Sequence, residues 1–560
     1  MMSLGILSAQ QPKIGTTPSS VVNAVSFIPA GLPNYGIAQG SLFSIFGTNL
    51  APSPAVQATT YPLQTTLGGT SVKVTVNGVS KDAYISFAAA LGGYDQINAI
   101  LPSDTPVGTG TVTVTYKGQT SAPAPITVVK TQPGIAAWNS RGSGGAAATN
   151  GANQFVTLGN SVHPKDVIVL WATGLGPVDP TTEATQAPKP FEPVVPVKVF
   201  IGGKEANVAY AARSGYTAED QINVEVPAGV DGCFVPVVVQ ANGALSNYVT
   251  IPVSASGATC ADPLSFTSQE LLSAQQAGSY RTGSIVLSRI AESLSILGIP
   301  INGTTDTANA AFAKYDYTKL IGSTGVNAGQ LSVSTLGSCS VYTFTGGALT
   351  LPTDQSVPDP LDAGTLTITG PKGTAQVKPT SVPGVYSTTL GGGISAPLPG
   401  FPAPTPLFLD PGSYTIDNGT GGTGTNAVGH FNVAFTLPQF ITWSNMDAIN
   451  TVNRSQGVDV TWTGGDPNGK VIVSGTSVTA TSGDGPGAGF VCIESASAGH
   501  FFVKPEVLLA LPSSALTNLT DFGGIMFVTG GGVQATFTAP GLDKGTVLVD
   551  GGNAKPVSFK

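Results

Sequence analysis

The strongest constraint on this chain is an internal repeat. The segment Ser41–Pro52 aligns with Asp166–Pro177, and the offset is 125, the difference between 166 and 41. The same offset holds without a gap for Val72-Lys73-Val74 on Val197-Lys198-Val199, Gly78 on Gly203, Asp95-Gln96-Ile97-Asn98 on Asp220-Gln221-Ile222-Asn223, Pro102 on Pro227, Gly118 on Gly243 and Ser121 on Ser246. Self-similarity in one register over so many positions indicates a duplicated structural unit.

Each copy consists of short alternating strands separated by turns. Ser71–Val76 is followed by Asn77-Gly78, and Val112–Tyr116 is followed by Lys117-Gly118. Asn-Gly supplies the positive φ angles of a two-residue hairpin, and a period of two buries one face of each strand. The pattern is typical of a two-sheet sandwich. We therefore predict an all-β fold with tandem immunoglobulin-like β-sandwiches and few short helices.

The composition supports this class and excludes several partners. At 560 residues the chain is several times the usual domain length of about 100–150 residues, so it needs several cores. Only 10% of the residues are charged, and a net charge of −8 without a basic run argues against nucleic acid and membrane surfaces as partners. No apolar run approaches the roughly 20 residues of a transmembrane helix, so we predict no transmembrane segment.

The sequence divides into five segments. Met1–Ala9 resembles the end of a signal peptide with a small-residue cleavage site. Ser140–Asn153, almost all Gly, Ala, Ser and Asn, is predicted to be a long loop that opens the second copy. The predicted segments are a leader remnant and N-terminal arm at 1–19, sandwich one at 20–130, sandwich two at 131–255, a β-rich domain at 262–437 and a β-sandwich at 438–560. The sequence leaves open whether 262–560 forms one domain or two.

Two short helices interrupt the strands of the second half. Thr267-Ser268-Gln269-Glu270 is a capping-box pattern, and it predicts a helix that stops at Gly278. Lys504-Pro505-Glu506 predicts a second helix through Leu511, with proline in the first turn. Strands are predicted at 284–289, 341–345, 365–369, 385–389, 413–416, 431–436, 458–462 and 471–474.

The four cysteines, Cys233, Cys260, Cys339 and Cys492, are too widely spaced for a Cys-x-x-Cys motif. Of the three connectivities we favour Cys233 with Cys260 and Cys339 with Cys492, because each pair then stays within one half of the chain. Four buried free thiols in a cytosolic protein are the alternative.

The first half resembles a known family. Val22–Phe27, Gly40–Ala51, the Asp-Gln-Ile-Asn segments and Ala172–Pro177 are similar to the uncharacterised C-terminal domain family of secreted acidobacterial proteins, over about residues 20–255. The resemblance implies an exported protein with immunoglobulin-like sandwiches and no known activity, so it assigns no functional residue. Here the unit is N-terminal. Gly337–Cys339 and Val452–Trp462 resemble regions of other secreted acidobacterial proteins, which are equally uncharacterised.

No sequence motif predicts catalysis, and we expect no enzyme and no catalytic residue. Gly464–Lys470 has the spacing of a phosphate-binding loop, but Val471 replaces the required Ser or Thr and the flanks are strands, so a hairpin turn is expected. The three histidines, His163, His430 and His500, lie in no recognisable motif. Because a Ser-His-Asp triad can assemble from distant residues, a hydrolase within 262–560 stays open.

The most polar candidate site is itself repeated: Asp95, Gln96 and Asn98 in the first copy, and Asp220, Gln221 and Asn223 in the second. A carboxylate beside two amides suits Ca²⁺ or sugar hydroxyls, but we favour a role in bracing loop backbone. Apart from Ca²⁺ here, no cofactor and no other metal is predicted. Among four tryptophans, Trp138 beside the Gly-rich loop is the candidate for sugar stacking, and Trp171 and Trp462 are expected in the core.

These observations favour a secreted or cell-surface protein with a structural or adhesive role, able to self-assemble and without catalysis. Its partners would be itself, other surface proteins or polysaccharide. A carbohydrate-binding module array on extracellular polysaccharide is the alternative, which an exposed aromatic platform would support and four buried tryptophans would oppose. A hydrolase within 262–560 would need His430 or His500 close to a Ser and an Asp.

Overall fold

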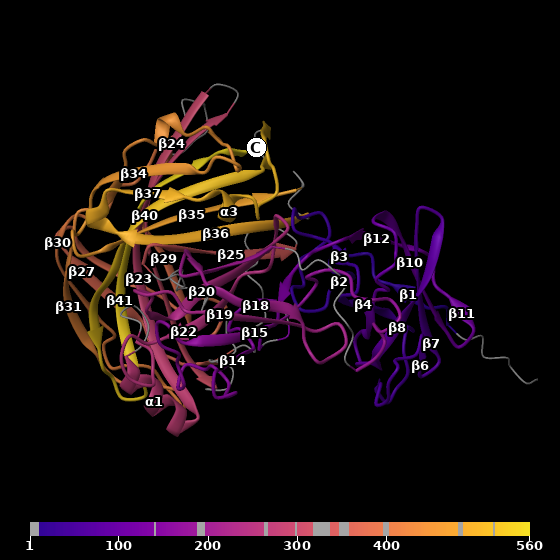
Figure 1. Ribbon diagram of the computed structural model, residues 1–560. Helices are drawn as coiled ribbons and strands as arrows, with labels where there is room; N and C mark the ends of the chain where they lie inside the picture. The colour runs from indigo at the N-terminus through magenta and orange to yellow at the C-terminus, as the bar shows by residue number, and fades with distance from the viewer. Residues whose placement is uncertain are drawn as a thin grey trace, which may run out of the picture. The chain divides into compact units, whose positions relative to one another are not determined.

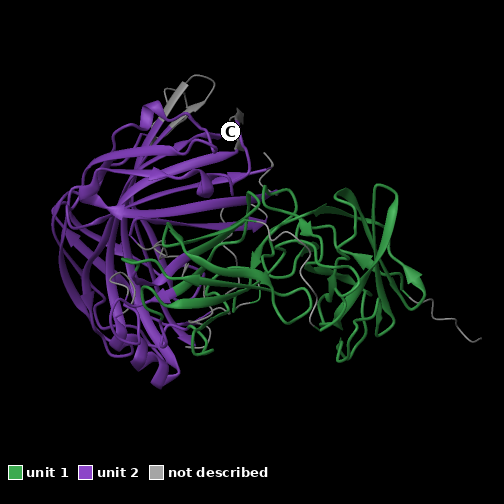
Figure 2. Ribbon diagram, in the orientation of Figure 1, with its two compact units in different colours: residues 1–156, 162–230, 237–251 green, residues 157–161, 231–236, 252–560 purple. Residues whose placement is uncertain are grey.

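The computed structural model describes residues 10–138, 140, 142–186, 196–261, 267–296, 299–316, 336–345, 358–395, 403–479, 485–518 and 521–560. These residues divide into two compact units. Unit 1 holds residues up to 156 with 162–230 and 237–251, and unit 2 holds 157–161, 231–236 and 252–560 (Figure 2). The segment predicted as the end of a signal peptide, Met1–Ala9, lies outside the described residues.

The first sandwich of unit 1 is built around β8, which belongs to both of its sheets. The first part of β8 pairs with β7, its second part pairs with β9, and the register shifts between Ile85 and Phe87. The strand order is β1-β4-β9-β8-β7-β10-β12-β3, with β2, β5, β6 and β11 added at the side. The strands are β1 Lys13–Ile14, β2 Val21–Asn23, β3 Ile37–Ala38, β4 Leu42–Thr48, β5 Val56–Gln57, β6 Thr66–Leu67, β7 Thr70–Val76, β8 Val79–Ala90, β9 Asp95–Ile100, β10 Gly108–Tyr116, β11 Gln119–Thr120 and β12 Ala124–Val129.

The second sandwich repeats this order in two five-stranded sheets. One sheet has the order β13-β15-β19-β18 with β14 beside β15, and the other has β17-β16-β20-β21 with β22 beside β20. Its strands are β13 Gly134–Ile135, β14 Ala148–Asn150, β15 Val167–Thr173, β16 Val197–Ile201, β17 Lys204–Ala206, β18 Val208–Arg213, β19 Asp220–Glu225, β20 Gly232–Ala241, β21 Ala244–Leu245 and β22 Val249–Val253. Strands β15 and β19 match β4 and β9 at the offset of 125, so the predicted tandem all-β fold is confirmed (Figure 1).

Two different dipeptides form the same hairpin turn in the two copies. Asn77 and Gly78 both have positive φ, and so do Gly202 and Gly203 at the equivalent positions of the second copy. This conformation is the one that a two-residue hairpin between right-twisted strands requires, and Asn and Gly adopt it at low cost.

Two details of the first half differ from the prediction. Lys13 and Ile14, which we placed in an N-terminal arm, form β1 and pair with Thr48 and Gly47 at the edge of the first sheet. The segment predicted as a long loop, 140–153, contains β14, which pairs with β15. Short edge strands are held by backbone pairing and are too short to show an apolar periodicity. Their sequences therefore did not predict them.

Unit 2 is dominated by a nine-stranded sheet with the order β25-β36-β35-β40-β41-β23-β24-β26, and β29 also pairs with β24. A four-stranded sheet, β28-β27-β30-β31, packs with it. The strands are β23 Ser279–Ile296, β24 Ile299–Asp316, β25 Ser338–Thr345, β26 Asp359–Pro360, β27 Leu366–Gly370, β28 Gly373–Val377, β29 Val385–Ser395, β30 Gly412–Asp417, β31 Asn432–Leu437, β35 Lys470–Val478, β36 Pro486–Ser495, β40 Gly524–Phe537 and β41 Lys544–Pro556.

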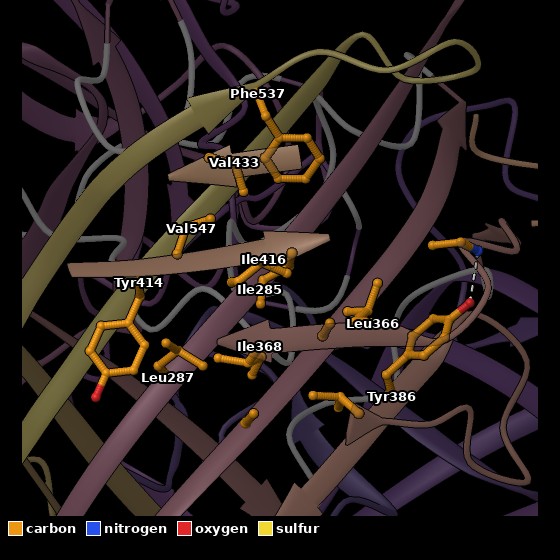
Figure 3. Packing of buried hydrophobic residues seen from close by; sticks show 14 of the residues in the cluster. Ile285, Leu287, Leu366, Ile368, Tyr386, Tyr414, Ile416, Val433, Phe537 and Val547 are labelled. Carbon is orange, nitrogen blue, oxygen red and sulfur yellow. Dashed lines mark hydrogen bonds between the residues drawn. The ribbon is translucent and has the colours of Figure 1, made fainter. Parts of the chain in front are cut away.

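The core of unit 2 lies between these two sheets. Ile285 and Leu287 of β23 face Ile368 of β27 and Ile416 of β30, and Phe537 of β40 closes one end (Figure 3). The Tyr386 hydroxyl accepts a hydrogen bond from the backbone N–H of Ala363 at 2.7 Å, so this buried phenol has a partner inside the apolar cluster. Apolar burial of this extent supplies the main driving force for folding.

The predicted boundary between 262–437 and 438–560 is wrong, because it divides one sheet. Strand β23 comes from the first range and β41 from the second, and they pair in parallel from Thr282 with Lys544 to Glu292 with Ala554. The described part of 252–560 therefore forms one compact unit. Pairing between strands more than 250 residues apart is not visible in local sequence patterns. Those patterns therefore suggested a domain boundary that the sheet does not have.

Smaller elements complete unit 2. They are β32 Ile441–Trp443, β33 Thr451–Val452, β34 Val458–Gly464, β37 His500–Val503, β38 Leu516–Asn518, β39 Asp521–Phe522, β42 Ser558–Phe559 and the 3₁₀ turns η2 Met446–Ala448 and η3 Ala496–Ala498. Gly464–Lys470 is not the predicted hairpin turn, because β34 pairs with β32 and β37 whereas β35 pairs with β36 and β40. The segment instead connects two sheets.

The predicted helices are present. Helix α1, Ser268–Ala277, begins with the reciprocal capping box of Thr267 and Glu270 and ends at Gly278 in the left-handed conformation. Helix α3, Pro505–Leu508, has proline in its first turn and is shorter than predicted. No helix in the described part of the chain is long and apolar enough to span a membrane.

Candidate functional site

The repeated acidic residue braces a loop in the first sandwich. Asp95 is buried at the start of β9, and its Oδ2 atom accepts hydrogen bonds from the backbone N–H groups of Leu50 at 2.6 Å and Ala51 at 3.3 Å. These N–H groups follow the last residue of β4, where the ladder no longer supplies acceptors. The carboxylate therefore serves as the acceptor that the turn after β4 lacks.

Asp220 does the same in the second sandwich and also has a cationic partner. Its Oδ2 accepts from the N–H of Leu175 at 2.8 Å, and its Oδ1 lies 3.2 Å from Nη1 of Arg213. Both side chains are only 2% exposed, which makes this a fully buried ion pair. Burial raises the pKa of Asp220, while Arg213 and the backbone N–H groups of Leu175 and Gly174 act to lower it.

Within each polar segment, the side-chain amides of Gln and Asn are hydrogen-bonded to each other. The Gln96 side chain donates to Asn98 Oδ1 at 2.9 Å, and Gln221 donates to Asn223 Oδ1 at 2.8 Å. Ser44 also donates to Asn98 Oδ1 at 2.8 Å. In both copies the carboxylate faces backbone N–H groups and the amides form a separate pair on the strand, so the six residues make two backbone braces and two amide pairs.

Arg213 also connects the two sandwiches of unit 1, a role that the sequence did not reveal. Its Nη2 atom donates to the carbonyl oxygens of Gly176 in the second sandwich and Gly40 in the first, both at 3.2 Å. The contact of Nη1 with Asp220 is an ion pair rather than an aligned hydrogen bond, so the charge is held mainly by carbonyl dipoles and by Asp220. Arg213 thus fixes one sandwich against the next.

A second acidic residue closes the same junction. Oε2 of Glu183, a buried residue of the second sandwich, accepts from the backbone N–H of Ser103 in the first at 2.6 Å. Burial raises the pKa of Glu183, and the hydrogen bonds from Ser103 lower it in part. In return the Ser103 hydroxyl accepts from the N–H of Val178 at 3.0 Å.

Further contacts join the sandwiches along this junction. The N–H of Leu42 donates to the Thr173 hydroxyl at 3.1 Å, and the N–H of Leu63 donates to the carbonyl of Ala184 at 2.8 Å. An apolar cluster drawn from both sandwiches packs beside them: Leu63, Ile100, Ala218, Leu42, Ala58, Tyr84 and Ala184. Hydrogen bonds, an ion pair and apolar packing together make the junction a built interface.

Trp138 lies on the surface of the second sandwich with an aromatic partner. It is 40% exposed and contacts Phe155, which is 58% exposed, with ring centroids 4.8 Å apart and ring planes at 77°. The sequence singled out Trp138 but not Phe155. Trp443 and Trp462 are buried, and Trp171 is partly buried. Trp138 is therefore the exposed member of the four.

Each histidine lies near an aspartate. His163 is 3.2 Å from Asp166, and His500 is 3.1 Å from Asp459, measured from Nδ1 to the carboxylate oxygen. His430 lies 3.9 Å from Asp417. All three imidazoles are at least 45% exposed. Within the described ranges no hydrogen bond joins a serine hydroxyl to His430 or His500, so no triad geometry is observed there.

Unit 2 contains an open cavity of about 560 Å³ at the far end of the β23–β24 hairpin. Glu292 and Ser293 of β23 line it with Asn302 of β24 and Asn553 of β41. The Ser293 hydroxyl donates to Asn302 at 3.1 Å, and Asn553 accepts from the N–H of Trp443 at 2.8 Å. Two of the polar groups thus already serve the fold. Among the residues that the structure describes, no group of three or more His, Cys, Asp or Glu side chains could hold a metal ion.

Both predicted disulfides are formed. Cys233 is bonded to Cys260, and Cys339 on β25 is bonded to Cys492 on the neighbouring strand β36. Cys233 and Cys260 pack in a small cluster with Leu158, Phe234, Leu271, Ala274 and Tyr280, which links the segment before α1 to the helix itself.

Comparisons with known proteins give no family. No family model and no curated protein matches the chain, so the resemblance to the acidobacterial family stays a prediction. Among solved structures, tandem immunoglobulin domains of titin are 10% identical and cover 39% of this chain and 90% of theirs, with a TM-score of 0.12. Domains 5–6 of the S-layer protein SbsC are 11% identical and cover 44% of this chain and 100% of theirs, with a TM-score of 0.16.

A third structure covers more of the chain. SGBP-B of the Bacteroides ovatus mixed-linkage glucan utilization locus, in complex with a mixed-linkage heptasaccharide, is 11% identical and covers 89% of this chain and 97% of its own, with a TM-score of 0.13. TM-scores this low do not support an equivalence of whole chains.

Proposed function

We propose that this chain is an extracellular structural or adhesive protein in which the tandem sandwiches serve as a stiff spacer and as binding faces. The observation that carries the proposal is the junction within unit 1. A spacer transmits force or sets a distance only if its modules do not swivel, and contacts between domains of one chain are usually small and polar enough to allow motion.

The junction opposes such swivelling in a specific way. Moving the first sandwich away would take Gly40 from Arg213, and Ser103 from Glu183. The guanidinium would keep Asp220 and Gly176 but lose one hydrogen bond, and the Glu183 carboxylate would lose its bond from Ser103. A hydrogen bond to a charged group contributes about 1.5–3 kcal/mol. Bending at this junction is therefore opposed by more than apolar contact alone.

The two disulfides support an extracellular place of action. Disulfides persist in oxidising compartments and are rare in the cytosol, where thiols are kept reduced. Cys339–Cys492 joins adjacent strands and Cys233–Cys260 joins a strand to the segment before α1. Both pairs are buried, which protects them from reductants.

The test is fractionation of the native host with thiol alkylation before lysis. We expect the chain in the medium or the surface fraction, with all four cysteines protected from alkylation until a reductant is added. A chain found in the cytosolic fraction with four reactive thiols would overturn the proposal.

A second experiment separates self-assembly from a spacer role. Light scattering and negative-stain electron microscopy of the full chain, under non-reducing conditions, should show filaments or regular oligomers if the protein assembles with itself. A monomeric particle would remove the self-assembly version and leave a spacer that carries a binding face for a different partner.

A further inference from the structure

The contact between Trp138 and Phe155 is unusual for this chain. Among the described residues it is the one contact between two aromatic rings in which both residues are exposed. Large apolar side chains on a surface are common singly, but a contacting pair exposes a continuous aromatic area. The two rings come from different hairpins, so their pairing is a product of the fold.

Backbone and side-chain hydrogen bonds hold the hairpin that carries Trp138. The N–H of Trp138 donates to the carbonyl of Gly145 at 2.9 Å. At the base of the hairpin, Asn247 accepts from the N–H of Ile135 at 2.8 Å and donates to the carbonyls of Ile135 and Gly142, both at 2.9 Å. The Gly-rich segment is thus anchored to the sandwich on both sides of Trp138.

The hairpin that carries Phe155 is also closed. The N–H of Val156 donates to the carbonyl of Ala148, and the N–H of Asn150 donates to that of Gln154, both at 2.9 Å. Inside the turn, Asn150 Oδ1 accepts from the N–H groups of Ala152 at 3.0 Å and Gln154 at 2.9 Å. Two closed hairpins present the rings already in place, which lowers the entropy lost when a ligand binds.

The hairpin that carries Phe155 is polar and uncharged. Residues 148–155 contain no charged side chain, and the amides of Asn153 and Gln154 are exposed beside Phe155. Aromatic faces bind the C–H faces of pyranose rings, and amides both donate to and accept from sugar hydroxyls. A nucleic acid would need basic residues, and the chain carries a net charge of −8 with no basic run.

We infer that Trp138 and Phe155 form a binding platform for a neutral polysaccharide. The inference rests on the adhesive part of the proposed function and deepens it by naming the partner. A single pair of rings on an open surface contacts only a short stretch of sugar, so a polymer, which offers many equivalent stretches to the same platform, is the favoured ligand.

Affinity gel electrophoresis of the full chain tests this platform. The gels contain dextran, galactomannan or hydroxyethylcellulose as neutral probes, and alginate as the anionic probe. We expect retardation by at least one neutral polymer and none by alginate. Trp138→Ala should weaken binding by roughly tenfold, Phe155→Ala by several-fold, and Trp138→Phe by less than Trp138→Ala.

Tyr216→Ala is the matched control, because Tyr216 is 56% exposed and lies in the same sandwich. It should leave the retardation unchanged, and unaltered melting temperatures would show that all variants fold. Retardation that survives both Trp138→Ala and Phe155→Ala would overturn the inference. So would retardation by alginate alone or by none of the four polymers.

Failure here is distinguishable from failure of the proposed function. An extracellular, disulfide-bonded chain that ignores all four polymers would remove the platform and leave the structural role. A cytosolic, reduced chain would remove the role itself, whatever it binds in a gel.

Discussion

The two sandwiches of unit 1 share a scaffold and differ at the last residue of one strand, β8 in the first copy and β18 in the second. The strand registers pair Arg213 with Asp220 and Ala90 with Asp95, so Arg213 of the second copy occupies the position of Ala90 in the first. Ala90 is partly buried, and its backbone N–H donates to the carbonyl of Pro52 in its own sandwich at 2.9 Å. Arg213 is buried, faces Asp220 and reaches the carbonyl of Gly40 in the other sandwich. The same strand position therefore carries only a methyl group in one copy and builds a junction in the other.

Other slots differ in the same way. Glu183 falls on Ala58, and Cys233 falls on Gly108. In each case the first copy has a small residue where the second has a group that bonds elsewhere in the chain. By contrast, Ser121 and Ser246 accept from the N–H groups of Val114 and Val239 in the same manner. The shared positions build the sandwich, and the differing positions connect it.

The largest loss of stability is expected from a substitution of Arg213. Arg213→Ala leaves Asp220 buried without its cationic partner, and loss of one member of a buried ion pair costs about 3–5 kcal/mol. Hydrogen exchange of the full chain, read by mass spectrometry, should show this loss in peptides that cover β15 and β19.

Two controls sharpen the test. Asp95→Asn in the first copy keeps an acceptor for the N–H groups of Leu50 and Ala51, so we expect a loss of only about 1 kcal/mol. The double variant Arg213→Met with Asp220→Asn removes both charges and should be more stable than Arg213→Ala. A cost below about 1 kcal/mol for Arg213→Ala would contradict the role assigned to the pair.

The next effect concerns the tether that only the second copy has. Cys233→Ala with Cys260→Ala opens a link between positions 27 residues apart, and the chain-entropy model gives a loss of about 3 kcal/mol. Exchange should rise in peptides around Cys260 and α1. Peptides that cover β10, where Gly108 occupies the equivalent position, should not change; equal loss in both sandwiches would show that the tether is not specific to the second.

The smallest effect is a pH dependence at Glu183. Burial raises the folded-state pKa of this carboxyl, so the folded state holds the proton more tightly than the unfolded state does. Its contribution to stability is complete below the unfolded pKa of about 4.3 and is lost as the pH rises through the higher folded value.

The measurement is the melting temperature of the wild type and Glu183→Gln between pH 4 and 7. The wild type should lose more stability than the variant as the pH rises, because only the wild type has this titrating group. Parallel curves would mean that Glu183 does not titrate differently in the folded chain.

Strands, turns and helix caps could be predicted because their signals are local. The turn at Asn77-Gly78, the strands β4 and β15, and the capping box of Thr267 and Glu270 were all readable from neighbouring residues. The two disulfides followed from cysteine spacing, with the alternative pairings open until the structure closed them.

What could not be predicted depends on contacts between distant residues. Arg213 and Gly40 are 173 residues apart in the sequence, and the residues around neither of them predict the hydrogen bond between them. A comparison of Arg213 with Ala90 within the repeat, which requires a loop two residues longer in the second copy, was the one available signal, since a buried arginine needs a partner. Strand β24 was missed because its Asn, Asp and Ala residues have low strand propensity, and long pairing with β23 and β29 overrides it.

The pairing of β23 with β41 has a consequence for the order in which the chain matures. The strands of each sandwich lie within about 120 residues of one another. In unit 2, by contrast, Thr282 pairs with Lys544, so the central ladder cannot form until both segments have been synthesised. Synthesis is vectorial, and domains generally fold as they become complete. The sandwiches are therefore complete early, whereas unit 2 remains an exposed intermediate until its last long strand, β41, has been synthesised. During this interval the protein is most vulnerable to proteases and to aggregation.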